Sequence, residues 1–186
     1  MERREMLTIN VPISPEGWDE AKQEFVEPEY RTLQLEHSLV SLSKWESKWH
    51  KPFYSKKEKT EEEMLDYIKC MTLTKNVDSD VYNHLTIDNV KDVKDYINDP
   101  MTATTFSRDE KGQSNSETIT SELIYYWMIA SNIPFECQKW HLNRLITLIR
   151  VCSIKNAPPK KRSKRDIMSR NAALNAARRK QMNTKG

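Results

Sequence analysis

The sequence predicts a mainly α-helical protein. Its 186 residues include only three Gly but five Trp and eight Met, whereas a turn-rich β fold normally needs more glycine. Apolar residues recur at steps of three and four through several segments, most clearly in residues 122–152. We therefore expect a small helical domain around a C-terminal helical hairpin, with a short N-terminal β-strand and a basic C-terminal helix.

The hairpin is predicted from two amphipathic segments joined at Asn132–Pro134. The first runs from Ile119 to Ser131, and the second begins near Pro134, because proline suits the first turn of a helix. Apolar residues of the second segment are Leu142, Leu145, Ile146, Ile149 and Cys152. We predict that Leu145, Ile149 and Trp127 are buried. The uninterrupted apolar run covers eight residues, against the ~20 that a membrane span needs, so we expect no membrane segment.

The N-terminal strand is predicted from alternation. Leu7, Ile9, Val11 and Ile13 are separated by Thr8, Asn10 and Pro12, and Pro12 restricts the strand to an edge or an end. A single strand is not stable alone. Two pairings are open: with residues 101–106, or with the same strand of another subunit, which would make the protein a homo-oligomer. Residues 14–17 are predicted to form a turn.

A helical pattern is predicted from about Glu29. Its apolar positions are Leu35, Leu39, Leu42, Trp45 and Trp49, with Glu46 and Lys48 on the other side and Pro52 after its end. Trp45 and Trp49 should stack one turn apart. Burial in the core or in a helix contact is the main interpretation of this pair. An exposed platform for a partner or a nucleic-acid base is the alternative.

Capping signals place the middle helices. Thr60 followed by Glu63 forms a capping box, and Thr86 caps a further helix that ends at Asp99–Pro100. The polar segment of residues 107–117 is predicted to be a mobile loop.

The charges divide the chain. Residues 158–186 contain ten Lys or Arg and one acid, a net charge of +9, which leaves −6 on the remainder of a chain whose total is +3. We predict a helical body at 1–156 and a basic tail at 157–186, with a hinge at residues 157–159. The tail should form a helix from Ile167 to Met182, ordered mainly when bound to an anionic partner. The candidate partner-binding residues are Trp45, Trp49, Lys160, Lys161, Arg162, Lys164, Arg165, Arg170, Arg178, Arg179 and Lys180.

The sequence offers no recognisable reaction centre. It lacks a glycine-rich phosphate loop, G-x-S-x-G, H-E-x-x-H and C-x-x-C. Cys137 and His141 lie four residues apart, but we interpret them as a buried thiol and an imidazole on a helix surface. We expect no catalytic residue, metal or cofactor. Three cysteines without a pairing pattern, and a first segment without a secretory apolar core, favour an intracellular protein with buried free thiols.

Four segments of the sequence carry a resemblance: LEHSLVSLSKWESKWHKPF (Leu35–Phe53), DPMTATTF (Asp99–Phe106), the predicted hairpin and NAALNAARR (Asn171–Arg179). They resemble segments of a family of small proteins from tailed bacteriophages. The chain resembles a tail assembly chaperone. The resemblance implies a helical, non-enzymatic protein of the host cytoplasm that coats the tape measure protein and delivers tail tube subunits to it. Several members of the family have a longer form made by ribosomal frameshifting.

The alternative function comes from the tail alone. The run KKRSKR is typical of nucleic-acid-binding segments, and a helix with Arg170, Arg178, Arg179 and Lys180 among Asn and Ala suits an RNA groove. The chain would then be a nucleic-acid-binding phage regulator or packaging factor.

Overall fold

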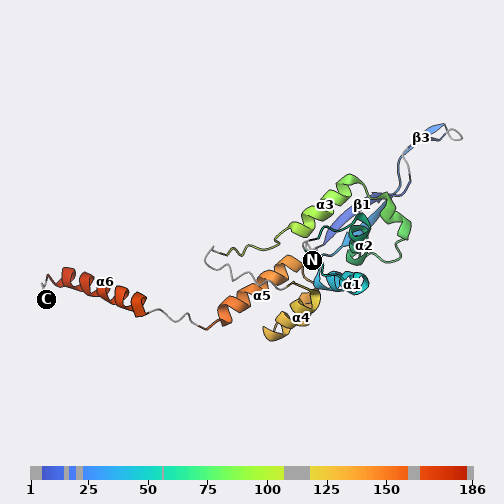
Figure 1. Cartoon of the computed structure of the whole chain (residues 1–186). Helices are drawn as coiled ribbons and strands as arrows, with labels where there is room; N and C mark the ends of the chain where they lie inside the picture. Colours follow the sequence, from blue (N-terminus) through green and yellow to red (C-terminus); the bar gives the residue numbers. More distant parts are fainter. Residues whose placement is uncertain are drawn as a thin grey trace. The chain divides into compact units, whose positions relative to one another are not determined.

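The computed structural model describes residues 6–14, 17–19, 23–55, 57–106, 118–158 and 164–183. The chain divides into two compact units, Met1–Ser153 and Ile154–Gly186. The described residues are mainly helical, with a short N-terminal pair of strands, which confirms the predicted fold class (Figure 1). None of the described helices has both the length and the apolar character needed to cross a lipid bilayer.

The N-terminal strand finds its partner nearby in the sequence. β1 (Leu7–Pro12) pairs antiparallel with β4 (Tyr30–Leu35), with Leu7 opposite Leu35 and Pro12 opposite Tyr30. The predicted pairing with residues 101–106 was therefore wrong, and so was the helix expected from Glu29, whereas the pairing with a second subunit stays a prediction. Leu35 fits both the helical spacing and a strand alternation. Leu33 and Leu35 alternate with polar neighbours, and this segment forms a strand.

The connection between β1 and β4 contains a second strand pair. β2 (Gly17–Asp19) pairs antiparallel with β3 (Glu24–Val26). The Ser14 hydroxyl accepts a hydrogen bond from the Glu29 amide at 2.8 Å, which closes the base of this connection. Part of the turn predicted at residues 14–17 lies outside the described residues.

Helix α1 (Leu39–Trp49) supplies the centre of the core. Ser38 caps it with Ser41 in a capping box, and the helix ends at His50, which adopts a left-handed conformation with φ of 51°. Leu39, Leu42 and Trp45 are at most 1% exposed. Their spacing of three residues lines one face of the helix, so this part of the predicted pattern is confirmed.

Two helices flank the strands and α1. α2 (Glu61–Met71) begins at the predicted Thr60 capping box, and it lies against α1. After the 3-10 helix η1 (Ser79–His84), α3 (Ile87–Asn98) begins at Thr86 and ends before Asp99, as predicted. α3 packs along β1, where its Val93 is 1% exposed (Figure 1).

The two helices predicted near the C-terminal end of the body are present, but the second begins later than expected. α4 (Ser121–Ala130) is followed by the 3-10 helix η3 (Phe135–Lys139), and α5 runs from Leu142 to Asn156. Pro134 precedes the 3-10 helix rather than α5. Leu145 and Ile149 are buried as predicted, whereas Trp127 is only partly buried at the edge of the core.

A buried carboxylate joins three of these segments. Glu46 was predicted to lie on the polar side of α1, but it is only 7% exposed. One of its carboxylate oxygens accepts a hydrogen bond from the Phe53 amide, and the other accepts one from the Ser121 amide, both at 2.7 Å. Glu46 therefore satisfies an amide at the start of α4 that would otherwise lack a partner within its own helix.

The second unit contains α6 (Lys164–Met182), which confirms the helix predicted there. Pro159 of the predicted hinge lies outside the described residues, and so do the candidate residues Lys160, Lys161 and Arg162.

Candidate partner-binding surfaces

The two tryptophans proposed as binding residues have different environments. Trp45 is 1% exposed, and its indole N–H donates to the Glu63 carbonyl at 2.8 Å. Trp45 is thus a core residue and forms no partner surface, which corrects that assignment. Trp49 is half-buried and stacks on Trp45 with ring centroids 6.2 Å apart, which confirms the predicted stacking.

Trp49 is held by polar neighbours as well as by stacking. Its indole N–H donates to Asp66 at 2.9 Å, and Lys48 forms an ion pair with the same carboxylate. Burial alone would raise the pKa of Asp66, but the hydrogen bonds from Lys48 and Trp49 outweigh burial and lower this pKa below its ordinary value. The Nζ of Lys51 lies 5.6 Å from the Trp49 ring centroid. The accessible edge of Trp49 is therefore rigid and bordered by cations.

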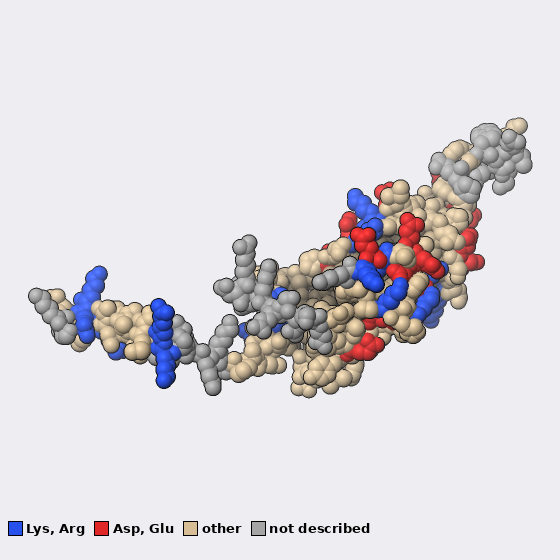
Figure 2. Space-filling view, viewed as in Figure 1, with Lys and Arg blue, Asp and Glu red and all other residues tan. Residues whose placement is uncertain are grey.

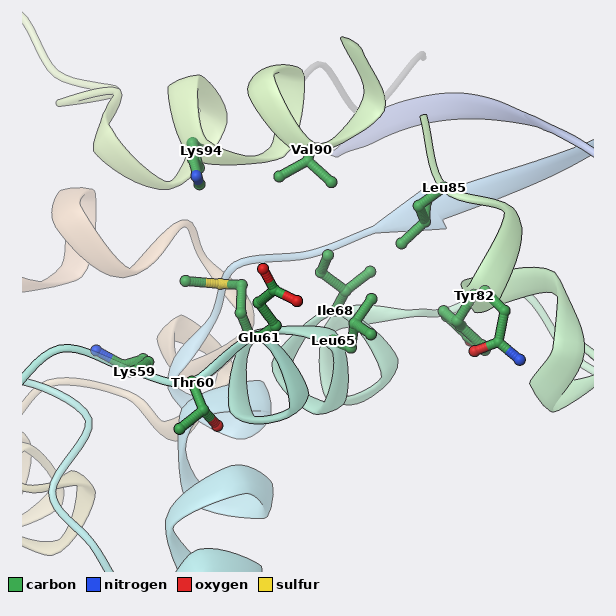
Figure 3. Close-up of a pocket in the computed structure, with 11 residues that line it drawn as sticks. Lys59, Thr60, Glu61, Leu65, Ile68, Tyr82, Leu85, Val90 and Lys94 are labelled. Atoms are coloured by element: carbon green, nitrogen blue, oxygen red, sulfur yellow. The ribbon is translucent and has the colours of Figure 1, made fainter. Parts of the chain in front are cut away.

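A groove of about 480 Å³ lies between α2, η1 and α3. Its apolar lining comes from α2 on one side and from the η1–α3 region on the other, as Figure 3 shows: Met64, Leu65, Ile68, Tyr82, Leu85 and Val90. Lys59, Glu61 and Lys94 also line the groove. Three separate elements build it, so no single stretch of the sequence indicated it. The half-exposed Met64 and Leu65, beside the buried Ile68, are the local sign that this side of α2 is not fully covered.

Two buried histidines form the polar centre of the body. His141 is 0% exposed, so the prediction of a surface imidazole was wrong. Its Nε2 lies 2.9 Å from the Tyr96 carbonyl, and the His37 Nδ1 lies 2.6 Å from the Tyr67 hydroxyl. Burial, with a smaller contribution from the charge of His141, lowers the pKa of His37 to about 3. The His37 ring is therefore neutral at ordinary pH, and its role is structural.

The cysteines have the environment of structural thiols. Cys70, Cys137 and Cys152 are free. Cys137 is buried as predicted, whereas Cys70 and Cys152 are only partly buried, which corrects the burial predicted for them. Burial raises the pKa of Cys137 and also that of Cys70, which disfavours the reactive thiolate. Among the described residues, no group of three or more His, Cys, Asp or Glu is placed to hold a metal ion.

The basic residues of α6 form an accessible surface. The six that were predicted from sequence and are described all have exposed side chains: Lys164, Arg165, Arg170, Arg178, Arg179 and Lys180 (Figure 2). Three large apolar side chains of this helix are also accessible, with Met168 72%, Leu174 46% and Met182 74% exposed. Every described side chain of α6 is therefore accessible to a partner.

The chain was also compared with known proteins. No protein-family model, curated protein or solved structure matches it.

Proposed function

We propose that the protein is a non-enzymatic tail assembly chaperone of a tailed bacteriophage, which binds the tape measure protein and recruits tail tube subunits in the host cytoplasm. The observation that carries the proposal is the exposure and basic character of α6. It is a 19-residue basic helix without a buried described side chain, and it contains the phrase Asn171–Arg179 that resembles the family. The chemistry of α6 is that of a binding element.

The shape and charge of α6 suit a long helical partner. At 1.5 Å per residue the helix is about 28 Å long. It carries six basic residues and one acid, and its central part is rich in Ala and Asn. Small side chains allow a partner backbone to approach closely, and the cations can pair with acidic side chains along it. Such a helix can lie along an acidic helical segment of the tape measure protein.

The groove between α2 and α3 supports the same proposal. Its apolar lining and 480 Å³ volume suit large apolar side chains of an amphipathic helix. Lys59 and Lys94 can pair with acidic residues that flank such side chains. The body and the tail thus each provide a surface for a helical, partly acidic partner.

Co-expression with the tape measure protein tests the proposal. The full chain should yield a soluble complex, whereas the double variant Arg178→Glu/Arg179→Glu should lose at least 10-fold in affinity. The double variant Lys44→Glu/Lys75→Glu is the matched control, because it reverses two exposed cations of the body. No complex with the full chain, equal binding by both double variants, or a gene outside the tail operon would contradict the proposal.

A second candidate function is favoured by the arrangement along α6. Asn171, Asn175 and Arg178 lie on one side of the helix, because steps of four and three residues return to the same face. Amide and guanidinium groups in this arrangement can read nucleic-acid bases. If the chain binds RNA or DNA, the logarithm of affinity should fall linearly with the logarithm of salt concentration, and the tape measure protein should not compete.

A further inference from the structure

From Leu123 onward, helix α4 is apolar around its whole circumference, whereas its first turn carries the exposed Glu122. Residues 123–135, LIYYWMIASNIPF, contain no charged side chain. On the inner side Ile124 and Met128 are 0% exposed, whereas on the outer side Tyr126 is 63% and Ile129 is 60% exposed. A helix that is apolar all round is normally covered on all sides, so the outer side of α4 has the composition of an interface.

The first turn after α4 extends this surface. Phe135 is 54% exposed and its ring centroid lies 6.4 Å from that of Tyr125, which is next to Ile129 around the helix. The Tyr125 hydroxyl is also 3.0 Å from Oε1 of Gln138, within η3. Tyr125 therefore fixes Phe135 beside α4. We call Tyr126, Ile129 and Phe135 the α4 face.

We propose that the α4 face binds the α4 face of a second copy of this chain. A symmetric dimer brings a surface against itself, so a surface with charge of one sign repels its copy, as α6 would. Tyr126, Ile129 and Phe135 carry no charge, and the exposed Glu122 on the same side of α4 lies one turn before Tyr126. Its Tyr and Phe side chains are types that are enriched at protein interfaces.

The border of the face favours the same occupant. Exposed Glu136 and Lys139 lie on one 3-10 helix and carry opposite charges. In a symmetric pair, Glu136 of one copy can face Lys139 of the other, and the second such pair follows from the symmetry. The groove between α2 and α3, by contrast, has two lysines and one acid in its lining, so it does not complement itself in this way.

The size of the face sets the strength of the contact. Stable dimers bury about 800 Å² on each partner, and three side chains with their neighbours supply only part of that area. We therefore expect a concentration-dependent dimer with a Kd on the order of 10 µM. This contact is independent of the tape measure and nucleic-acid proposals, since α6 takes no part in it.

Sedimentation equilibrium of the full chain over roughly 1–300 µM tests the proposal, because this range brackets such a Kd. Wild type should dimerise, and Ile129→Glu should raise the Kd at least 10-fold. Ile87→Glu is the matched control, because Ile87 is 89% exposed on α3 and its substitution should leave the Kd unchanged. Circular dichroism confirms that each variant is folded.

The border provides a second test that does not disturb α4. Glu136→Lys should weaken the dimer by placing like charges opposite each other, and the double swap Glu136→Lys/Lys139→Glu should restore it. A wild type that stays monomeric at all concentrations, a dimer indifferent to Ile129→Glu, or a double swap no better than the single variant would overturn the proposal.

Discussion

Helices α1 and α6 have the same kind of secondary structure but opposite environments. α1 has 11 residues, and its Leu39, Leu42 and Trp45 are almost completely buried. α6 has 19 residues, and every side chain described in it is exposed. Packing against α2, α4 and η3 stabilises α1, whereas α6 depends on the high helix propensity of Ala and Arg. The first kind of helix contributes to the stability of the fold, and the second presents side chains to a partner.

The largest expected effect on stability comes from shortening a buried leucine of the body, and an exposed leucine of α6 serves as the comparison. Leu145→Ala should lower the free energy of unfolding by about 2–5 kcal/mol, because Leu145 is 0% exposed and its loss leaves a cavity. Leu174→Ala in α6 is the matched control and should change it by less than about 0.5 kcal/mol, since Leu174 is 46% exposed. Urea unfolding followed by tryptophan fluorescence measures both variants. Equal destabilisation by the two would show that α6 packs into the core.

A smaller effect on the free energy of unfolding is expected from a change of pH, and it arises in the body. The pKa of His37 is about 3 in the folded chain, against 6.5 as its ordinary value. Below pH 6.5 the unfolded chain therefore binds a proton that the folded chain does not, and the free energy of unfolding falls as pH falls. The expected slope approaches 1.4 kcal/mol per pH unit between pH 6 and pH 4.5. α6 contains no histidine, so this dependence belongs to the body.

Thermal unfolding of wild type and His37→Asn over this pH range tests the assignment. Asn can still contact the Tyr67 hydroxyl but does not titrate, so the variant should be less stable at pH 7 and less sensitive to pH. An unchanged slope in the variant would assign the pH dependence to other groups.

The smallest expected effect on stability comes from removing the tail. Truncation after Asn156, the last residue of α5, should leave the melting temperature within about 1 °C, because no described side chain of α6 is buried. The same truncation should abolish the partner binding proposed for α6. Differential scanning fluorimetry and a pull-down assay measure the two properties on the same sample. A truncated chain that unfolds would place the tail in the core.

The sequence predicted the helices best where their end signals are local. Three helix boundaries are determined by contacts within a few residues. They lie at Thr60 with Glu63, at Thr86, and at Asp99 with Pro100. The period of Leu39, Leu42 and Trp45 likewise identified the inner face of α1. The basic residues of α6 were found because a run of charge is visible in any sequence.

Contacts between distant residues explain the errors. The pairing of β1 with Tyr30–Leu35 depends on register, and Leu35 fits both a strand and a helix period. His141 and Glu46 are polar residues whose burial depends on partners 45 and 75 positions away, Tyr96 and Ser121. The groove between α2 and α3 likewise exists only after three elements have assembled.

The bond from the Ser121 amide to Glu46 has a consequence for the order of folding. This amide lies in the first turn of α4, where it has no carbonyl partner within its own helix, and its acceptor lies in α1. α4 therefore gains this stabilising contact only after α1 has formed and the chain has closed a loop of about 75 residues. The segment that presents the α4 face to a second copy therefore receives this contact only once α1 is in place.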